Sequence, residues 1–399
     1  MEKVLFDFTY YQEGDVHGGG EYGNVVFKEF LSREGISGCG IFFYENRKID
    51  LKIVKMAEEK GILIHAIKEL RNLPAIVREY GYTTIYSALP YSEKWATLKW
   101  MKDVRFIGTF HGLRRVELAL ANEAENKYCK TSDIVVSDYI FRNKGKEVDE
   151  QIIGYEKALK AFRNRKIIVV SEHSKYAMMY FYPEILSDEI IVLYSPEKLN
   201  RSVPSLEQEE ALLKKWEIER KNYGLIISAD RFEKNPIRGV LAYDQLFSQR
   251  SKIIPEQYKV VVCGVKDKEN FMKRIENPER FLLLGYVEDM ELETLYKNAQ
   301  LFLYPTLNEG FGYPPIEAMK YGTICACSVN TSVLEVCQDM VLYFNPLLID
   351  EIAIRILQSF DEEIRKKKEE EIAKKLPDLR ERQRNDLKKL VDIILGVDK

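Results

Sequence analysis

Residues 304–323 read YPTLNEGFGYPPIEAMKYGT and predict a strand, a polar turn and a helix in close succession. The apolar strand ends near Pro305, and a pair of prolines then opens the helix, where a missing N–H group leaves no hydrogen bond unmade. The glycines on either side of Phe311 allow backbone amides to approach a ligand at the positive end of that helix. Such a turn suits a phosphate or a crowded sugar.

The same alternation of strand and helix extends over most of the chain, on both sides of a polar stretch at 195–222. Short apolar runs followed by helical patterns are typical of parallel sheets that helices cover. The expected strands are Val4–Phe8, Gly40–Tyr44, Ile62–Ala66, Thr83–Ser87, Arg105–Phe110, Lys166–Val170, Ile190–Leu193, Leu225–Ala229, Tyr258–Cys263, Phe281–Leu284, Leu301–Pro305, Thr323–Ala326 and Val341–Phe344. Because 195–222 is polar and carries two prolines, it is interpreted as a domain connection.

These patterns predict the fold class α/β, with two Rossmann-like β/α/β domains at residues 1–200 and 201–375. The carboxyl ends of the two sheets are expected to face a deep cleft between the domains. The charged tail predicts two helices divided at Pro377, and the last of them, residues 376–399, is expected to pack back toward the N-terminal domain. The stretch from about 120 to 150, within the less regular segment 113–160, fits the alternation poorly and is interpreted as an insertion.

The charge balance and the cysteines limit the class of protein. The chain has 399 residues, with 60 Lys and Arg against 63 Asp and Glu, which argues against a nucleic-acid binder that depends on phosphate contacts. No run approaches the roughly 18 apolar residues of a membrane-spanning helix, and no secretory signal is visible. Six scattered cysteines are interpreted as buried apolar side chains in a reducing cytoplasm, and four histidines without paired spacing predict no zinc site. We therefore expect a cytoplasmic protein.

The pair Glu309 and Glu317 carries a resemblance to a known family. The segment EGFGYPPIE matches the E-x7-E signature of retaining glycosyltransferases with the GT-B architecture, grouped as glycosyltransferase family 4. The likeness extends over 283–346, where a strand end, a D-x-x-L helix, the acidic pair and an L-x-E-V turn follow in the family's order. The resemblance implies a GT-B fold whose second domain binds a nucleoside diphosphate sugar and whose first domain receives the acceptor.

The resemblance also implies roles for individual residues. Glu317 corresponds to the carboxylate that accepts hydrogen bonds from the ribose hydroxyls of the donor, and Glu309 corresponds to the one that contacts the donor sugar. The amides of Gly310, Phe311 and Gly312 would lie beside the sugar and the diphosphate. Ionised carboxylates only accept hydrogen bonds, and such charge-assisted bonds contribute roughly 1.5–3 kcal/mol each.

Residues 226–246 (IISADRFEKNPIRGVLAYDQL) resemble the basic diphosphate clamp of the same family. Lys234 and Asn235 fit its K-N form. The partner of Lys234 is Arg231 or Arg238, because Arg231 stands closer to the lysine than is usual in the family. Fixed cations stabilise the charge of a departing diphosphate. With such a clamp no metal or other cofactor is expected, and the sequence contains no D-x-D motif.

The first domain carries two candidate positions next to the transferred sugar. Gly18, Gly19 and Gly20 resemble the family's glycine-rich loop, in which unobstructed amides face the sugar; the alternative is an ordinary turn between a strand and a helix. His111, in the segment RFIGTFHGL, stands where the family often has a histidine at a strand end. The resemblance implies that His111 lies beside the donor sugar. The alternative interpretation is that His111 is a buried histidine of the core.

Two further segments have open interpretations. Ser171 and Ser174, in the segment VVSEHSK, cap a helix or contact a ligand. Residues 91–106 combine tryptophans with lysines, so they form an ordinary amphipathic helix or rest on an anionic membrane surface. The second alternative would make the protein peripheral at the inner face of the membrane.

The resulting functional prediction is a hexosyltransferase. It moves a hexose from a nucleoside diphosphate sugar to a hydroxyl of a glycan or lipid-linked glycan, with retention at the anomeric carbon. The style of the donor domain favours the mannosyl- and rhamnosyltransferases of polysaccharide and O-antigen assembly. The alternatives are a nucleotide-sugar epimerase on the same fold and a non-catalytic glycan-binding or partner subunit. The sugar, the nucleotide, the acceptor and the oligomeric state stay open.

Overall fold

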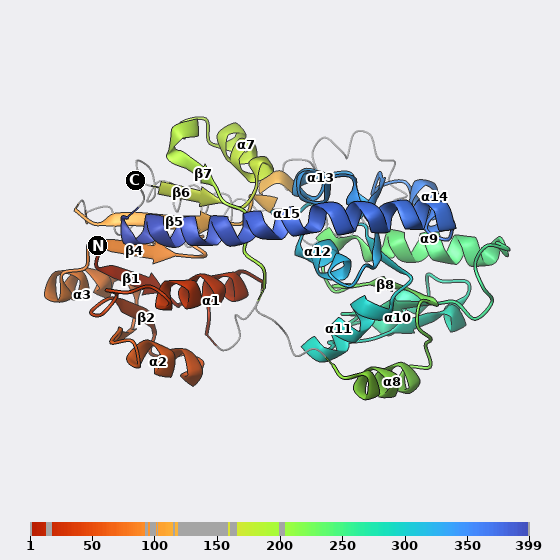
Figure 1. Cartoon of the computed structure of the whole chain (residues 1–399), viewed down its shortest axis with the longest axis horizontal. Helices are drawn as coiled ribbons and strands as arrows, with labels where there is room; N and C mark the ends of the chain where they lie inside the picture. Colours follow the sequence, from red (N-terminus) through yellow and green to blue (C-terminus); the bar gives the residue numbers. More distant parts are fainter. Residues whose placement is uncertain are drawn as a thin grey trace. The chain divides into compact units, whose positions relative to one another are not determined.

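The structure is a computed structural model, and it describes residues 2–12, 18–91, 103–114, 116–118, 166–198 and 204–397, together with Trp95, Met101 and Leu159. These residues divide into two compact units. The first contains the described residues up to 198 and the C-terminal residues 380–397, and the second contains 204–379. Each unit is built around one parallel sheet, as the sequence predicted (Figure 1).

The first unit holds a seven-stranded parallel sheet in the order β3-β2-β1-β4-β5-β6-β7. Its strands are β1 (Val4–Asp7), β2 (Gly40–Tyr44), β3 (Leu63–Ile67), β4 (Thr84–Ser87), β5 (Arg105–Phe110), β6 (Lys166–Val169) and β7 (Ile190–Val192). Its described helices include α1 (Gly18–Leu31), α2 (Leu51–Glu58), α3 (Leu73–Tyr80) and α7 (Glu172–Phe181). The buried ring of Phe6 on β1 packs against Phe27 and Phe30 of α1, so this helix is fixed against the centre of the sheet.

The second unit holds a six-stranded parallel sheet in the order β10-β9-β8-β11-β12-β13. Its strands are β8 (Tyr223–Ile226), β9 (Lys259–Val262), β10 (Phe281–Leu283), β11 (Leu301–Tyr304), β12 (Ile324–Ser328) and β13 (Leu342–Phe344). Its described helices include α8 (Leu206–Lys215), α9 (Pro236–Ser248), α10 (Lys268–Met272), α11 (Asp289–Asn298), α12 (Tyr313–Met319), α13 (Thr331–Cys337) and α14 (Ile349–Gln358). Helices α9 and α14 lie side by side (Figure 1). The predicted strands of both sheets are present, with ends shifted by a few residues.

The C-terminal tail forms a single helix, α15 (Glu362–Leu395), of 34 residues, and Pro377 lies inside it. The prediction of two helices divided at Pro377 is therefore wrong. A proline inside a helix removes one backbone hydrogen bond and costs about 3 kcal/mol. The neighbouring Leu376 and Leu379 are buried, and this apolar burial offsets the loss.

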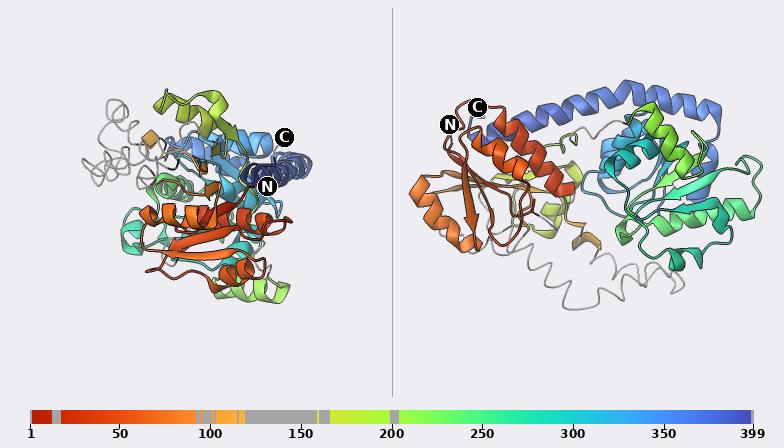
Figure 2. Two further views of the ribbon diagram at one scale, coloured as in Figure 1. Left: turned by 90° about the vertical axis from the view of Figure 1, so that its left-hand side faces the viewer. Right: turned by 90° about the horizontal axis from the view of Figure 1, so that it is seen from below.

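The C-terminal part of α15 belongs to the first unit and packs on it. Arg33, which follows α1, forms an ion pair with Asp392 at 3.2 Å, and Figure 2 shows α1 (red) beside the end of α15 (blue). The backbone N–H of Glu2 donates a hydrogen bond to the carbonyl of Leu395 at 2.9 Å. The last helix of the chain therefore packs on the unit that contains the first strand.

The structure tests several smaller predictions from the sequence. The described part of the chain contains no helix long and apolar enough to span a membrane. The described cysteines are free and buried, as expected: Cys39, Cys263, Cys325, Cys327 and Cys337. In the stretch 91–106, Trp95 and Met101 are buried in the core of the first unit, so these two side chains do not rest on a membrane. The lysines Lys94, Lys99 and Lys102, Trp100, Cys129 and most of 113–160 lie outside the described residues.

Candidate functional site

The two central strands of the second sheet end in the loops that carry the predicted clamp and the predicted acidic pair. β8 and β11 are parallel neighbours, with Gly224 opposite Leu301 and Leu225 opposite Phe302. The strand order runs outward from this pair in opposite directions. Ligands of open parallel sheets bind at the carboxyl edge of such a reversal. The candidate site therefore lies at the carboxyl ends of β8 and β11.

The side chains of Lys234 and Glu309 meet there. The Lys234 ammonium donates a hydrogen bond to Oε1 of Glu309 and a second one, at 2.9 Å, to the hydroxyl of Tyr304. The Tyr304 hydroxyl donates to the same Oε1 at 2.7 Å, and Oγ1 of Thr306 lies 2.8 Å from it. Lys234 and Glu309 are only 6% and 8% exposed. Removing two charges from water is costly, and these hydrogen bonds offset the cost.

Helix α13 holds the backbone of Glu309. The Glu309 N–H donates to Oγ1 of Thr331 at 3.1 Å, and Oγ of Ser332 donates to the Glu309 carbonyl at 2.9 Å. Thr331 has a φ of 44°, in the left-handed region that β-branched residues rarely adopt. Strain of this kind costs about 1–3 kcal/mol and is concentrated at functional sites. Both the side chain and the backbone of Glu309 are thus fixed.

Asn235 positions the loop between Lys234 and α9. Its side chain is fully buried, and its amide donates to the carbonyls of Pro305 and Pro346, both at 2.9 Å. Its amide oxygen accepts a hydrogen bond from Nη1 of Arg238 at 2.9 Å. Its φ of 52° is a left-handed conformation that asparagine tolerates well. The contacts of this side chain therefore join the ends of β11 and β13 to the start of α9.

The two candidate arginines lie in different surroundings. Arg231 is exposed and donates from Nε and Nη2 to Oε1 of Glu233, at 2.8 and 2.5 Å. Arg238 is 2% exposed and contacts Asn235. Arg231 is thus a side chain at the surface of the loop, and Arg238 supports the loop from inside the unit.

Glu317 lies on α12, which begins directly after the glycine turn. Gly312 precedes α12 with a φ of 97°, which only glycine adopts without strain. The ring of Phe311 is 4% exposed and packs against Tyr313, with centroids 5.3 Å apart. Glu317 is 5% exposed, and the hydroxyl of Tyr296 lies 3.4 Å from its Oε2. The sequence therefore buries two carboxylates on one loop–helix segment.

The glycine run of the first unit differs from the expectation. Gly18, Gly19 and Gly20 form the first turn of α1 and not a separate loop, while residues 13–17 lie outside the described residues. A Cβ added at Gly19 would lie 2.7 Å from the side chain of Leu89, and one at Gly20 would lie 3.0 Å from the ring of Tyr11. The glycines therefore permit a close approach of the helix end to the segments that follow β1 and β4.

His111 follows β5, and its imidazole lies beside α1. Its Nε2 is 2.9 Å from the carbonyl oxygen of Ala88. Because a carbonyl only accepts hydrogen bonds, this nitrogen carries the proton. The imidazole meets the ring of Tyr22 edge-on, with centroids 4.5 Å apart. His111 and the start of α1 are thus brought to one edge of the first sheet.

The junction after β6 is a helix cap. Oγ of Ser171 accepts a hydrogen bond from the N–H of Ser174 at 3.1 Å, at the first turn of α7. The two hydroxyls also lie 2.9 Å apart. The capping interpretation of Ser171 is therefore confirmed.

Sequence reasoning missed several polar residues, among them Asp7, which is only 1% exposed. It ends β1, and it accepts hydrogen bonds from the hydroxyl of Ser87 at 2.6 Å and from Thr9. Burial raises the pKa of Asp7 to about 6, and the hydrogen bonds from Ser87 and Thr9 act in the opposite direction. A carboxylate at the end of an apolar strand, VLFD, was the available signal.

A cavity of about 300 Å³ lies elsewhere in the second unit, at the amino ends of its strands. Its lining includes Glu217, Asn222, Glu256, Lys259 and Arg280. Asn222 precedes β8 and Lys259 opens β9, so the cavity lies at the opposite edge of the sheet from Lys234. Its position separates it from the candidate site. No group of three potential metal ligands occurs among the described residues.

The segment that carries the candidate site matches a known family. Residues 208–376 match the sequence model described as Glycosyl transferases group 1. This segment is a group 1 glycosyltransferase domain. It contains Lys234, Asn235, Glu309 and Glu317, whereas the first unit lies outside the match.

Curated relatives match the chain over part of their length. Over 157 residues the chain is 34% identical to O-antigen chain mannosyltransferase B of Escherichia coli, covering 38% of this chain and 40% of that protein. Over 189 residues it is 29% identical to O-antigen chain mannosyltransferase RfbU of Salmonella typhimurium, covering 46% of this chain and 48% of that protein. The chain thus spans less than half the length of these relatives.

A solved structure shares the whole fold. Anabaena Alr3699/HepE in complex with UDP and glucose superposes with a TM-score of 0.69, at 14% identity, over 99% of this chain and 100% of that chain. At such an identity the likeness establishes the fold alone. The α/β fold of the GT-B type, with two parallel sheets, is therefore confirmed.

Proposed function

We propose that the chain is a retaining glycosyltransferase of family 4, which transfers a hexose from a nucleoside diphosphate sugar to a hydroxyl of a glycan or lipid-linked glycan. The observation that supports this most is the meeting of Lys234 and Glu309 at the reversal of the second sheet, inside the matched segment 208–376. One edge of the sheet thereby offers a cation for a diphosphate and a carboxylate for sugar hydroxyls.

In this proposal each group contacts one part of the donor. The Lys234 ammonium and the amides of Gly310, Phe311 and Gly312 bind the diphosphate, Glu309 binds the sugar, and Glu317 binds the ribose. Lys234 is nearly buried, so its charge acts through a medium that screens it less than water does. The charge of the leaving diphosphate is then met by the protein and needs no metal ion.

The contacts of Glu309 favour a binding role over a nucleophilic one. Its Oε1 accepts hydrogen bonds from Lys234 and Tyr304, and such bonds stabilise the carboxylate and make it a weaker nucleophile. In the proposed step the bond between the anomeric carbon and the diphosphate oxygen breaks, while an acceptor oxygen attacks from the same face. The acceptor's proton passes to the departing phosphate oxygen, and Lys234 stabilises the negative charge that develops there.

The relatives suggest the substrates. Both curated proteins are named O-antigen chain mannosyltransferases, so mannose is the first sugar to test and an O-antigen-type glycan is the first acceptor. In this proposal Gly18–Gly20 and His111 of the first unit contact the transferred sugar. The chain would work in the cytoplasm, where nucleotide sugars are available.

A two-stage experiment tests the proposal. First, the melting temperature of the full chain is measured with UDP, GDP, dTDP and their sugars, because a ligand that binds only the folded state raises it. Second, the donor that binds is supplied with a labelled sugar, with and without glycan acceptor. Label on the acceptor, with the donor's anomeric configuration in NMR spectra, supports retaining transfer. A free epimerised sugar nucleotide would indicate an epimerase, and binding without any product would indicate a glycan-binding subunit.

A further inference from the structure

The hydroxyl of Tyr304 contacts both charged groups of the candidate site, Lys234 and Glu309. We propose that Tyr304 is a positioning residue, which holds the Lys234 ammonium and the Glu309 carboxylate in the relative geometry that the leaving diphosphate requires. This inference rests on the proposed function and adds to it a residue that belongs to a core strand and not to the family's loop motifs.

The hydrogen bonds of this hydroxyl have defined directions. It accepts from Nζ of Lys234 at 2.9 Å and donates to Oε1 of Glu309 at 2.7 Å. The same Nζ lies 5.2 Å from the centroid of the Tyr304 ring, within the range of a cation–π contact. The one side chain therefore contacts the ammonium through both its oxygen and its ring.

Packing alone does not explain the hydroxyl. The ring of Tyr304 is 2% exposed and stacks with Phe302 on the same strand, with centroids 5.7 Å apart. A phenylalanine would fill this space equally well, since only the oxygen atom distinguishes the two side chains. Burying a hydroxyl is unfavourable unless it forms hydrogen bonds. At this point of β11 the partners of the hydroxyl are the two charged residues of the site.

The hydroxyl is also chemically suited to this place. Burial, followed by the neighbouring charge of Glu309, raises the pKa of Tyr304 well above its usual value. The phenol therefore keeps its proton and donates a hydrogen bond to the carboxylate. Oγ1 of Thr306 approaches the same carboxylate oxygen, but Tyr304 contacts both Glu309 and Lys234. Small displacements of groups that stabilise a transition state reduce rates strongly.

The decisive variant is Tyr304→Phe, assayed in the full chain. We expect kcat for sugar transfer to fall about 10-fold or more, which corresponds to one hydrogen bond to a charged group. The Kd of the nucleoside diphosphate alone, measured by calorimetry, should change less than about threefold, because Lys234 keeps its charge and its hydrogen bond to Glu309 in this variant. Thr306→Val removes a hydroxyl that lies close to Glu309 and to the carbonyl of Glu233. Because this change leaves the contacts between Tyr304 and Lys234 intact, it should reduce kcat less than Tyr304→Phe does.

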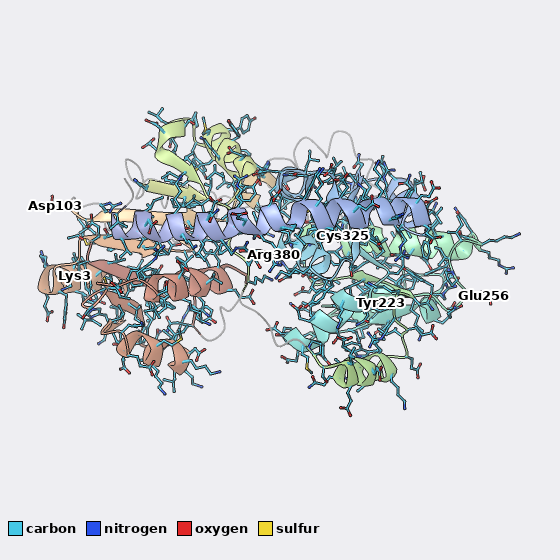
Figure 3. The ribbon with its side chains drawn as sticks, in the orientation of Figure 1. Lys3, Asp103, Tyr223, Glu256, Cys325 and Arg380 are labelled. Atoms are coloured by element: carbon cyan, nitrogen blue, oxygen red, sulfur yellow. The ribbon has the colours of Figure 1, made fainter. Side chains whose placement is uncertain are left out.

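Tyr223→Phe is the matched control. Tyr223 is a fully buried tyrosine of the neighbouring strand β8, labelled in Figure 3, and its hydroxyl donates to the carbonyl of Leu295 at 2.7 Å. This variant should lose thermal stability and keep kcat. If Tyr304→Phe behaves like the control, or keeps kcat within twofold of an active wild type, the positioning role is overturned and the proposed function stands. If the wild type binds no nucleoside diphosphate and transfers no sugar, both are overturned.

Discussion

Lys234 and Glu309 are 75 positions apart in the chain, yet the ammonium of one donates a hydrogen bond to the carboxylate of the other. Strand order explains the contact, because β8 and β11 are neighbours and both loops leave the same edge of the sheet. The pair carries no net charge. A bound diphosphate brings at least two negative charges and would therefore be attracted to the Lys234 ammonium. The Glu309 carboxylate would then accept hydrogen bonds from the sugar hydroxyls.

Glu317→Gln tests the assignment of the ribose contact. The amide keeps the shape of the side chain and its contact with Tyr296, but it removes the charge that strengthens hydrogen bonds from hydroxyls. We expect the Kd of the nucleoside diphosphate to rise about 10-fold, as for one or two charge-assisted bonds. The KM of the acceptor should stay within twofold. Equal losses for both substrates in steady-state kinetics would contradict the assignment.

Asp7 predicts a pH dependence of stability. Its pKa is about 6 in the folded chain because of burial, whereas an unfolded aspartate titrates near 4. Between about pH 4 and pH 6 the folded state therefore holds a proton that the unfolded state has released. This contribution stabilises the fold fully below about pH 4 and is lost as the pH rises through about 6. Its size is on the order of 2–3 kcal/mol.

Asp7→Asn removes this titration. The difference in melting temperature between the variant and the wild type, measured by circular dichroism, should favour the variant more at pH 8 than at pH 4.5. Asparagine can still accept from Thr9, and its amide can donate to Ser87. The same difference in melting temperature at both pH values would show that Asp7 is not the group responsible.

Asn235→Ala tests the support of the clamp loop. The change leaves two buried carbonyls, of Pro305 and Pro346, without this donor, and it places an alanine at a left-handed position. We expect the free energy of unfolding to fall by about 3–5 kcal/mol in urea titrations. As a control, Asn222→Ala removes an exposed hydrogen bond to Glu219 and should cost less than about 0.5 kcal/mol. A similar small effect at Asn235 would be inconsistent with this role.

Pro377→Ala tests how much the proline inside α15 costs the stability of the helix. Alanine supplies the N–H group that proline lacks, so the backbone hydrogen bond to the carbonyl of Ala373 becomes available. The helix gains up to about 3 kcal/mol, and the greater freedom of the unfolded chain takes back about 1 kcal/mol. We expect a net stabilisation of about 1–2 kcal/mol in urea unfolding. A loss of stability would mean that the proline is accommodated by a local kink that alanine does not reproduce.

The strands and the acidic pair could be predicted from the sequence, and the side-chain pairing of the site could not. Period and residue type place Glu309 and Lys234 at the ends of strands, and that is local information. The order of the strands depends on the whole sheet and not on local sequence. The contact between the two residues therefore could not be predicted. Tyr304 and Ser332 were missed for the same reason, since each acts through a residue distant in sequence. Pro377 was misjudged because local propensity ignores the burial of its neighbours.

We propose that the carboxyl ends of β8 and β11 bind the diphosphate of a sugar donor. Calorimetric titration of the full chain with UDP, GDP and dTDP measures this binding, with Lys234→Met as the variant. Lys215→Met is the control, since that side chain is 62% exposed and pairs with Glu291 at 3.1 Å. One nucleotide should bind the wild type and the control equally, and Lys234→Met should weaken it at least about 10-fold. Equal binding by all three proteins, or binding of none of the nucleotides, would show that Lys234 does not bind a diphosphate here.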